Sequence, residues 1–324
     1  MKAAVYEQYG PPEVFKITEV EQPTPKDDEV LIKVHAASVT TGDVNMRGFV
    51  FVPPSFKPMT RLAFGLNKPR SPILGVEVAG EIVAVGEDVT QFKPGDPVFG
   101  IDGARRGTYA EYKCMPEKAG LTHKPANLSY EEAAVIPNGA LTALTFLRMG
   151  KMQRGEHILI NGASGSVGTA AVQLAKYFGA EVTGVCSTTN LALVQSLGAD
   201  HVIDYTQEDF TQRHAAYDLI FDTVGKTTFG QCKAALKPNG RYLASAGGLG
   251  SMGQMLWTSI IGGKKVFAGA SSESKDDLVD IKGIVEAGHL KPVIDRRYSL
   301  DNIVEAHRYV DTGRKKGNVV VTVV

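Results

Sequence analysis

The chain has 324 residues, of which 43% are hydrophobic and 22% charged, so its length favours two domains and its composition a globular protein. Its 35 basic and 35 acidic residues cancel, which argues against nucleic-acid or membrane-surface partners. Glu7 interrupts the place of a signal-peptide core, and Cys114, Cys186 and Cys232 have neither disulfide nor zinc-lobe spacing. We therefore expect a cytoplasmic protein whose partners are small molecules and copies of itself.

Residues 1 to about 125 alternate short strand-like runs, at 31–34, 77–85 and 94–99, with proline and glycine. This pattern predicts a small, strongly bent antiparallel or barrel-like domain. Residues 49–72 differ, because five prolines are interleaved there with phenylalanines and basic residues. Since proline cannot continue a strand ladder, we expect a long loop that shapes a pocket for a flat, apolar substrate.

From Ser129, where a capping box opens a helix, strand-like and helical runs alternate. Apolar residues recur at helical spacing from Val167 to Phe178. This alternation predicts a parallel, doubly wound sheet that the chain leaves after about Ala268. Residues 318–324 are expected to form a closing strand that returns to the first domain. The strand candidates of the parallel sheet are residues 157–160, 181–185, 201–204, 218–222 and 241–244.

The segment N-G-A-S-G-S-V-G, residues 161–168, lies between the first of these strands and its helix. It is a variant of the G-x-G-x-x-G pattern with alanine in the first place. Pyrophosphate binds such a turn through free backbone N–H groups and the positive end of the helix dipole. The pattern therefore favours a dinucleotide site over a purely structural turn, formed by Ala163, Gly165, Ser166, Val167 and Gly168.

The end of the second strand, which in an NAD site places a carboxylate on the ribose, reads C-S-T-T-N from Cys186. Ser187, Thr188 and Thr189 can instead donate hydrogen bonds to a 2′-phosphate, so NADPH is the expected cofactor. NADH stays an option, because no Arg or Lys in this turn neutralises the phosphate. The alternative that these are ordinary polar turn residues also stays open.

Further motifs occur along most of the chain: M-K-A-A-V at 1–5, G-V-E-V-A-G at 75–80, K-P-G-D-P-V at 93–98, G-T-Y-A-E-Y at 107–112, G-A-D-H-V-I-D-Y at 198–205, F-D-T-V-G at 221–225 and P-N-G-R-Y-L at 238–243. With the glycine turn, they resemble the medium-chain dehydrogenase/reductase superfamily, and most closely its zinc-independent quinone oxidoreductase branch. The resemblance implies an α/β protein with a GroES-like β-barrel catalytic domain (1–127 and 269–324). The remaining part (128–268) would be a Rossmann domain with a doubly wound parallel sheet that binds NAD(P).

The resemblance also identifies the positions that bind catalytic zinc in the alcohol dehydrogenases of this superfamily. Thr40, Val76 and Asn138 occupy them here, and none supplies a thiolate or an imidazole. The four-cysteine structural lobe is missing as well. The implied chemistry is metal-free: hydride passes from the nicotinamide to a quinone or an α,β-unsaturated carbonyl, which takes up the negative charge on its own oxygen.

Site residues follow from the resemblance position by position. Thr40 lies where quinone reductases usually have an asparagine near the nicotinamide, and Asn45 where some have a tyrosine. Thr40 could contact the substrate or cap a turn, whereas Asp43 is favoured as a turn cap. Tyr109 is the candidate proton donor, with solvent as the alternative. The implied cofactor contacts beyond the glycine turn are Thr142, Tyr205, Val224, Ala246, Gly247, Gly248 and Asn318.

Three functions remain open. The first is an NADPH-dependent quinone or enone reductase that acts as a homodimer, with the sheet edge near residues 265–269 pairing across a two-fold axis. The second is an enoyl-thioester reductase whose substrate carries phosphates. The third is a nucleotide-binding protein without catalysis. The second is supported by a basic set in the first domain: Arg61, Lys68, Arg70, Arg105 and Arg106.

Overall fold

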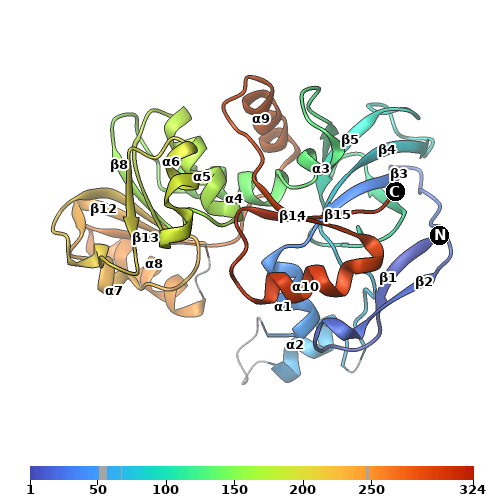
Figure 1. Ribbon diagram of the computed structural model, residues 1–324, viewed down its shortest axis with the longest axis horizontal. Helices are drawn as coiled ribbons and strands as arrows, with labels where there is room; N and C mark the ends of the chain where they lie inside the picture. Colours follow the sequence, from blue (N-terminus) through green and yellow to red (C-terminus); the bar gives the residue numbers. More distant parts are fainter. Residues whose placement is uncertain (51–56, 67, 246–247) are drawn as a thin grey trace. The chain divides into compact units, whose positions relative to one another are not determined.

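The computed structural model describes residues 1–50, 57–66, 68–245 and 248–324 (Figure 1). The chain forms two compact units. Unit 1 comprises Met1–Pro137, Glu273–Lys282 and Pro292–Val324, and unit 2 comprises Asn138–Ser272 and Gly283–Lys291. Unit 1 is therefore built from both ends of the chain, with most of unit 2 inserted between them.

Unit 1 contains a bent sheet with the strand order β14-β15-β3-β4-β5-β7, and β6 pairs with β3. Neighbouring strands are antiparallel except β14 and β15, which are parallel. The predicted closing strand is β15, and its Val320 pairs with Ser38 of β3. A separate hairpin joins β1 (Lys2–Tyr6) and β2 (Phe15–Glu19). The strands of the sheet are β3 (Glu29–Ser38), β4 (Glu77–Val85), β5 (Pro97–Ile101), β6 (Tyr112–Pro116), β7 (Gly120–His123), β14 (Ile294–Ser299) and β15 (Asn318–Thr322).

The stretch 49–72 is not the continuous loop that its prolines predict, because helix α2 (Lys57–Phe64) forms within it. Pro58 is the second residue of this helix, a position where the missing N–H is not needed for the helical ladder. Residues 51–56 and 67 of the stretch lie outside the described part of the chain. The prediction of a substrate-shaping loop concerns these residues as well and stays a prediction.

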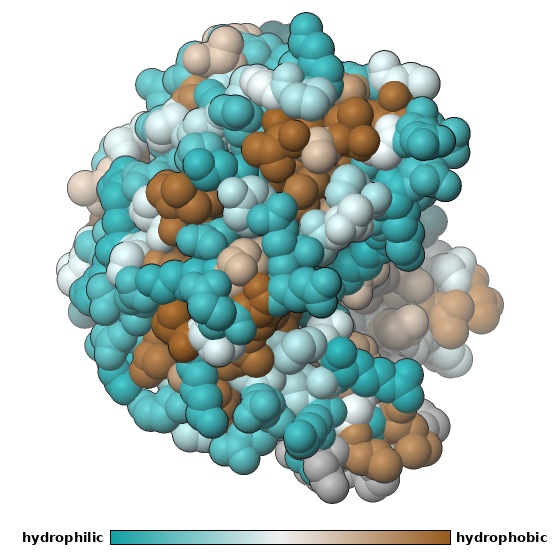
Figure 2. All heavy atoms as spheres, turned by 90° about the vertical axis from the view of Figure 1, so that its right-hand side faces the viewer, coloured by the Kyte–Doolittle hydropathy of each residue, from teal (hydrophilic) through white to brown (hydrophobic). Residues whose placement is uncertain are grey.

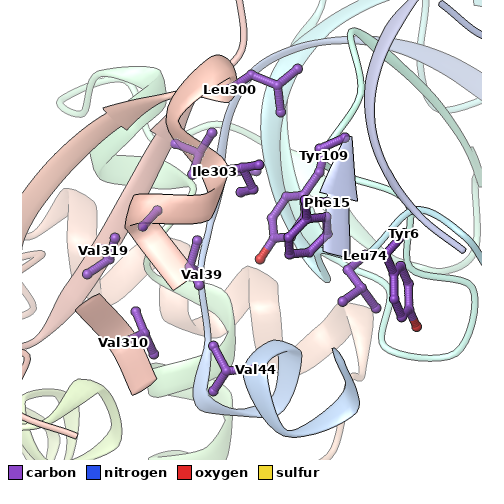
Figure 3. Packing of buried hydrophobic residues seen from close by; sticks show 14 of the residues in the cluster. Tyr6, Phe15, Val39, Val44, Leu74, Tyr109, Leu300, Ile303, Val310 and Val319 are labelled. Carbon is purple, nitrogen blue, oxygen red and sulfur yellow. The ribbon is translucent and has the colours of Figure 1, made fainter. Parts of the chain in front are cut away.

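The core of unit 1 lies between the strands and the helices α1 (Thr41–Gly48) and α10 (Ile303–Asp311). Figure 3 shows aliphatic side chains from both helices and the rings of Phe15 and Tyr109 in one cluster. His307 of α10 is also fully buried here, with its ring 4.6 Å from that of Phe15 and 5.6 Å from that of Tyr109. Its Nδ1 lies 3.1 Å from Nη1 of Arg47. A histidine thus occupies a core position beside a buried cation.

Unit 2 contains a parallel sheet, as predicted, and its strand order is β10-β9-β8-β11-β12-β13. The order changes direction between β8 and β11, and ligands of doubly wound sheets bind at such a switch point. Helices α4 (Pro137–Met149), α5 (Ser166–Tyr177), α6 (Leu191–Ser196), α7 (Phe229–Cys232) and α8 (Leu249–Ile261) connect and cover these strands (Figure 1). The strands are β8 (His157–Asn161), β9 (Glu181–Cys186), β10 (His201–Asp204), β11 (Tyr217–Asp222), β12 (Leu236–Ala244) and β13 (Lys265–Ala268).

Two further α-helices of the described ranges are α3 (Tyr130–Ala133) and α9 (Lys275–Glu286), and short 3-10 helices lie at residues 12–14, 188–190, 210–212 and 300–302. Across those ranges, each helix is too short or too polar to cross a bilayer. Figure 2 shows hydrophobic patches bounded by hydrophilic side chains on the face beside β1 and β2, which is the usual distribution on a water-facing surface.

Candidate functional site

The glycine turn after β8 leaves backbone N–H groups available to a ligand. Gly165 is the N-cap of α5, and no side chain in the described residues caps this helix. The N–H groups of Ser166, Val167 and Gly168 point out of the first turn and have no partner within the helix. With the positive end of the helix dipole, they form the arrangement that binds a phosphate group.

Close packing explains which positions of the turn must be glycine. A Cβ on Gly168 would lie 2.1 Å from the carbonyl oxygen of Gly162, so only glycine lets α5 approach the turn. The left-handed conformation falls on Gly162, with a φ of +82°, and not on Ala163. The methyl group of Ala163 is fully buried and faces Gly184 of β9. Alanine therefore fits in the first place of the pattern.

The end of β9 differs from the sequence-based interpretation in one respect. The hydroxyl group of Thr188 donates a hydrogen bond to Oδ2 of Asp204 over 2.5 Å, and this bond lowers the pKa of Asp204. A carboxylate is thus present, but it comes from the neighbouring strand β10, whose last residue is paired with Cys186 of β9. The interpretation missed it by considering β9 alone. The signal was available, because parallel neighbours end at one edge of a sheet.

Other side chains surround this edge. Asn190 is buried and donates to Ser164 Oγ at 3.1 Å and to Ser187 Oγ at 3.3 Å, which ties the two turns together. Tyr205 is 61% exposed, and its N–H donates to the carbonyl of Cys186. Ser187, Thr189 and Tyr205 therefore lie at one end of the sheet, where they can contact the adenosine part of a dinucleotide.

Asp222, at the end of β11, organises the loop that contains Val224. It is 1% exposed. Its Oδ1 accepts hydrogen bonds from the N–H groups of Val224 and Gly225 at 3.1 and 3.0 Å, and its Oδ2 accepts one from the Tyr242 hydroxyl group at 3.1 Å. It also accepts one from Asn161 of β8, over 3.2 Å. This carboxylate shapes the switch point, and its partners Asn161 and Tyr242 lie far from it in the sequence.

The remaining predicted cofactor residues of unit 2 are described in part. Thr142 is buried on α4. One turn earlier, a Cβ on Gly139 would lie 2.8 Å from the carbonyl oxygen of Ser166, so the first turn of α4 packs closely against that of α5. Gly248 is the N-cap of α8. Ala246 and Gly247 lie outside the described residues.

In unit 1, Thr40 and Asp43 form a capping box at the start of α1. The Thr40 hydroxyl group donates to Asp43 Oδ2 at 2.6 Å and accepts from the Asp43 N–H at 3.1 Å. Asp43 Oδ1 also accepts from the N–H of Gly75 at 3.2 Å. The predicted cap role of Asp43 is confirmed. Because the only proton of the Thr40 hydroxyl group is used in this cap, Thr40 does not donate to a substrate in this geometry.

Tyr109 is not placed to protonate a substrate. The side chain is fully buried in the core, and its hydroxyl group donates to the carbonyl of Ser38 at 3.1 Å. Burial and the Asp43 carboxylate raise the pKa of Tyr109 well above its ordinary value. A tyrosine can transfer a proton, but the side chain of Tyr109 is packed in the core. Asn45, on the exposed side of α1, is half-buried and has no side-chain hydrogen bond within the described part of the chain.

The start of β15 brings a further titratable group into unit 1. Asn318 is buried, and its side chain donates to the carbonyl of Val293 at 3.2 Å. Lys315 donates to the carbonyl of Gly317 at 2.7 Å. Burial lowers the pKa of Lys315 to about 8, although the Glu77 carboxylate opposes the shift. An ammonium group with a pKa of about 8 can supply a proton at neutral pH.

The three cysteines are free thiols, of which Cys186 and Cys232 are buried and Cys114 is half-buried. Burial raises the pKa values of Cys114, Cys186 and Cys232 to about 11, so all three are thiols at neutral pH. Among the side chains that the structure describes, no three His, Cys, Asp or Glu residues gather closely enough to hold a metal ion.

Residues 26–126 match the family model of the alcohol dehydrogenase GroES-like domain, and residues 197–321 match that of a zinc-binding dehydrogenase. The chain is 34% identical, over 99% of its length and 79% of the relative, to the 2-methylene-furan-3-one reductase of Solanum lycopersicum. It is 32% identical, with the same coverage, to the chloroplastic NADPH-dependent alkenal/one oxidoreductase of Arabidopsis thaliana. The quinone oxidoreductase of Coxiella burnetii has the same fold, with a TM-score of 0.88, 30% identity and coverage of 100% of this chain and 99% of that one. The predicted fold class is confirmed.

Proposed function

The chain belongs to the medium-chain dehydrogenase/reductase superfamily, and from this premise we propose that it transfers hydride from NADPH to a quinone or an α,β-unsaturated carbonyl without zinc. The observation that carries the proposal is the uncapped N-terminus of α5 behind a turn that only glycine can form at Gly162 and Gly168. This arrangement fits a pyrophosphate group. The relatives named above are reductases of quinones, alkenals and an exocyclic enone.

The residues of unit 2 hold the cofactor in this proposal. The first turn of α5 binds the pyrophosphate, Ser187 and Tyr205 contact the adenosine end, and the loop held by Asp222 positions the other end. A bound nicotinamide supplies the hydride. The acceptor delocalises the incoming charge onto its own oxygen, so the protein needs to orient the acceptor, exclude water and supply a proton. Lys315 and solvent are the two candidate sources of that proton.

A metal-free reaction is supported by the residues at the family's zinc positions. Thr40 spends its hydroxyl proton on the α1 cap, and Val76 and Asn138 lack the donor types that zinc prefers. The match to the zinc-binding dehydrogenase model covers residues 197–321 and so includes none of these three positions.

We propose NADPH as the preferred cofactor over NADH, with a modest preference. Support comes from the hydroxyl groups of Ser187 and Thr189 and from the relative that is named as NADPH-dependent. The Asp204 carboxylate acts in the opposite direction, because it binds the Thr188 hydroxyl group and repels a nearby phosphate. No Arg or Lys occurs in the turn to offset it.

A homodimer is proposed from one side of unit 2. Strand β13 is the edge of the parallel sheet, and α8 packs on it. Leu256, Trp257 and Ile260 of α8 are 65%, 65% and 81% exposed. Large apolar side chains beside an open strand edge favour pairing with a second copy. Light scattering on the wild type and on Ile260→Lys tests this: a dimer that becomes a monomer supports it, and a monomeric wild type contradicts it.

The reaction is tested by following oxidation of NADPH and NADH by chelator-treated protein with a panel of small quinones and enones. Turnover with NADPH supports the proposal, and loss of activity on chelation contradicts its metal-free part. Tight NADPH binding without turnover of any acceptor would favour a non-catalytic nucleotide-binding protein. The expected cytoplasmic location stays a prediction, and one of the relatives is named as chloroplastic.

A further inference from the structure

Two arginines of unit 1 gather on a cluster of aromatic rings near helix α2. The guanidinium carbon of Arg61 lies 5.6 Å from the centre of the Tyr9 ring and 5.3 Å from that of Phe49. The guanidinium carbon of Arg106 lies 5.7 Å from the centre of the Phe64 ring. The Tyr9 hydroxyl group donates to the carbonyl of Phe64 at 2.9 Å, so both arginines border one group of rings.

Neither arginine has a carboxylate partner in the described ranges, and the residues outside those ranges include no Asp or Glu. Arg105, by contrast, forms an ion pair with Glu29, and Arg70 donates to the carbonyl of Leu62 at 2.8 Å. Lys68 is exposed to solvent. Within the described residues, Arg61 and Arg106 are therefore the two members of the set that lie on aromatic rings and have no carboxylate partner.

Burial of a polar atom separates Arg61 from an ordinary solvated arginine. Nε of Arg61 is inaccessible to solvent and has no hydrogen-bond partner. A buried donor without an acceptor costs about 1–3 kcal/mol, and stacking on Tyr9 and Phe49 does not supply an acceptor. An anionic oxygen could pair with the charge of this guanidinium through its Nη groups, because Nε is closed to solvent and to a ligand alike.

The backbone of Arg106 is held in an unfavourable conformation by a buried ion pair. Its φ is +56°, in the left-handed region. Lys113 donates to the carbonyl of Arg106 and lies 2.9 Å from Oδ2 of Asp102, with both side chains less than 10% exposed. The N–H of Arg106 donates to the carbonyl of Asp102 at 3.0 Å. These contacts fix the backbone of Arg106, and with it the starting point of its side chain, beside Phe64.

The charges of Arg61 and Arg106 both act on the phenol group of Tyr9. Burial raises the pKa of Tyr9, and the charges of Arg61 and Arg106 both oppose this shift. Two like charges close to one phenol repel each other in the absence of an anion. The pair is also close to the helix that carries Asn45, because Phe49 is the C-cap of α1, about 6 Å along the axis from Asn45.

We propose that Arg61 and Arg106 bind an anionic group of the electron acceptor, a carboxylate, sulfonate or phosphate, so that the enzyme favours negatively charged quinones or enones. This inference rests on the proposed reductase function. It defines the acceptor class more narrowly, as a flat conjugated ring or enone with an anionic substituent. The anion could be attached close to the conjugated system or be a phosphate at the end of a thioester arm, and these two sources can be separated.

The test compares matched acceptors on Arg61→Met, Arg106→Met and the control Lys68→Met, which removes an exposed charge from the same region. The first pair of probes is a naphthoquinone sulfonate and the unsubstituted naphthoquinone. The second pair is crotonyl-coenzyme A and crotonyl-N-acetylcysteamine, which lacks phosphates. Loss of one charge-assisted hydrogen bond is expected to lower kcat/KM for an anionic probe roughly tenfold or more, with the neutral partner of each pair changed less than twofold.

The result decides between several outcomes. Selective loss with the sulfonate supports an anion close to the ring, and selective loss with crotonyl-coenzyme A alone supports a phosphate on a longer arm. Equal loss with charged and neutral probes would mean that the arginines only stabilise α2, and an equal effect of Lys68→Met would mean a diffuse field. Either result overturns the proposal.

A binding measurement keeps the inference separate from the reductase proposal. Calorimetric titration of the naphthoquinone sulfonate into each variant needs no turnover. Weaker binding to Arg61→Met and Arg106→Met, with no activity on any acceptor, would support the anion site and refute the proposed function. Binding that is the same in all variants would refute the anion site, whatever the activity.

Discussion

Protonation of His307 is expected to destabilise unit 1 in mild acid. Nδ1 of His307 accepts a hydrogen bond from Arg47, which is always charged, so the ring is neutral with its proton on Nε2. That Nε2 is buried without a partner. Burial, and then the Arg47 charge, lower the pKa of His307 well below its ordinary value. A second positive charge in this core would have no carboxylate of its own to pair with, because Asp311 pairs with Arg47.

The magnitude follows from linkage. Below about pH 6.5 the unfolded chain takes up a proton on this histidine, and the folded chain does not. Stability is therefore fully present above the unfolded pKa and falls as the pH drops toward the folded one. The slope is about 1.4 kcal/mol per pH unit for one group, so lowering the pH from about 7.5 to about 5 removes roughly 2 kcal/mol through His307 alone.

The variant His307→Asn isolates this contribution, because the amide oxygen of asparagine can replace Nδ1 as an acceptor but does not titrate. It should be less stable near neutral pH, since the smaller side chain leaves a cavity, and should lose about 2 kcal/mol less than the wild type on acidification. Urea unfolding is best followed by circular dichroism, because the single Trp257 lies in unit 2. Equal acid sensitivity of the two proteins would refute the assignment of a neutral, buried His307.

Three further predictions concern the site. Gly168→Ala should lower the melting temperature and weaken NADPH binding at least tenfold, because its Cβ would overlap a carbonyl oxygen. Gly165→Ala, whose Cβ has its nearest contact at 3.5 Å, should weaken NADPH binding without lowering the melting temperature. Equal melting temperatures of the two variants would contradict this difference. Asp204→Asn should raise the NADPH to NADH ratio of kcat/KM about threefold to tenfold, and an unchanged ratio would exclude a role for this carboxylate. If Lys315 donates the proton, kcat/KM falls as the pH rises through about 8, because the ammonium form is lost; Lys315→Met should flatten this profile, and a profile that it leaves unaltered would assign the proton to solvent.

The sequence predicted the parts of the fold that depend on local patterns. The strands and helices of unit 2 repeat short periodic runs, which predicted a doubly wound parallel sheet, whereas the strand order and its switch point come from the structure. The glycine turn was located because its conformations require particular residues. In contrast, helix α2 was missed because prolines were treated as breakers, although Pro58 lies in a first turn that tolerates it.

The errors in the candidate site have a common cause: the role of each of these residues depends on neighbours that are distant in the sequence. Tyr109 was chosen for its chemistry, but packing against Phe15 and His307 places it in the core. Asp204 and Asp222 were overlooked because their partners lie on other strands. Burial lowers the pKa of Lys315 to about 8, which a local run of basic residues does not reveal.

The return of the chain to unit 1 has a consequence for biosynthesis. One edge of strand β3 pairs with β15, and Ser38 faces Val320 in this pairing. This pairing cannot form until nearly the whole protein has been synthesised. The parallel sheet of unit 2 is complete by Ala268. On the ribosome, unit 2 can therefore assemble first, and unit 1 closes only when the last strand emerges, so β3 must be protected from wrong partners until then.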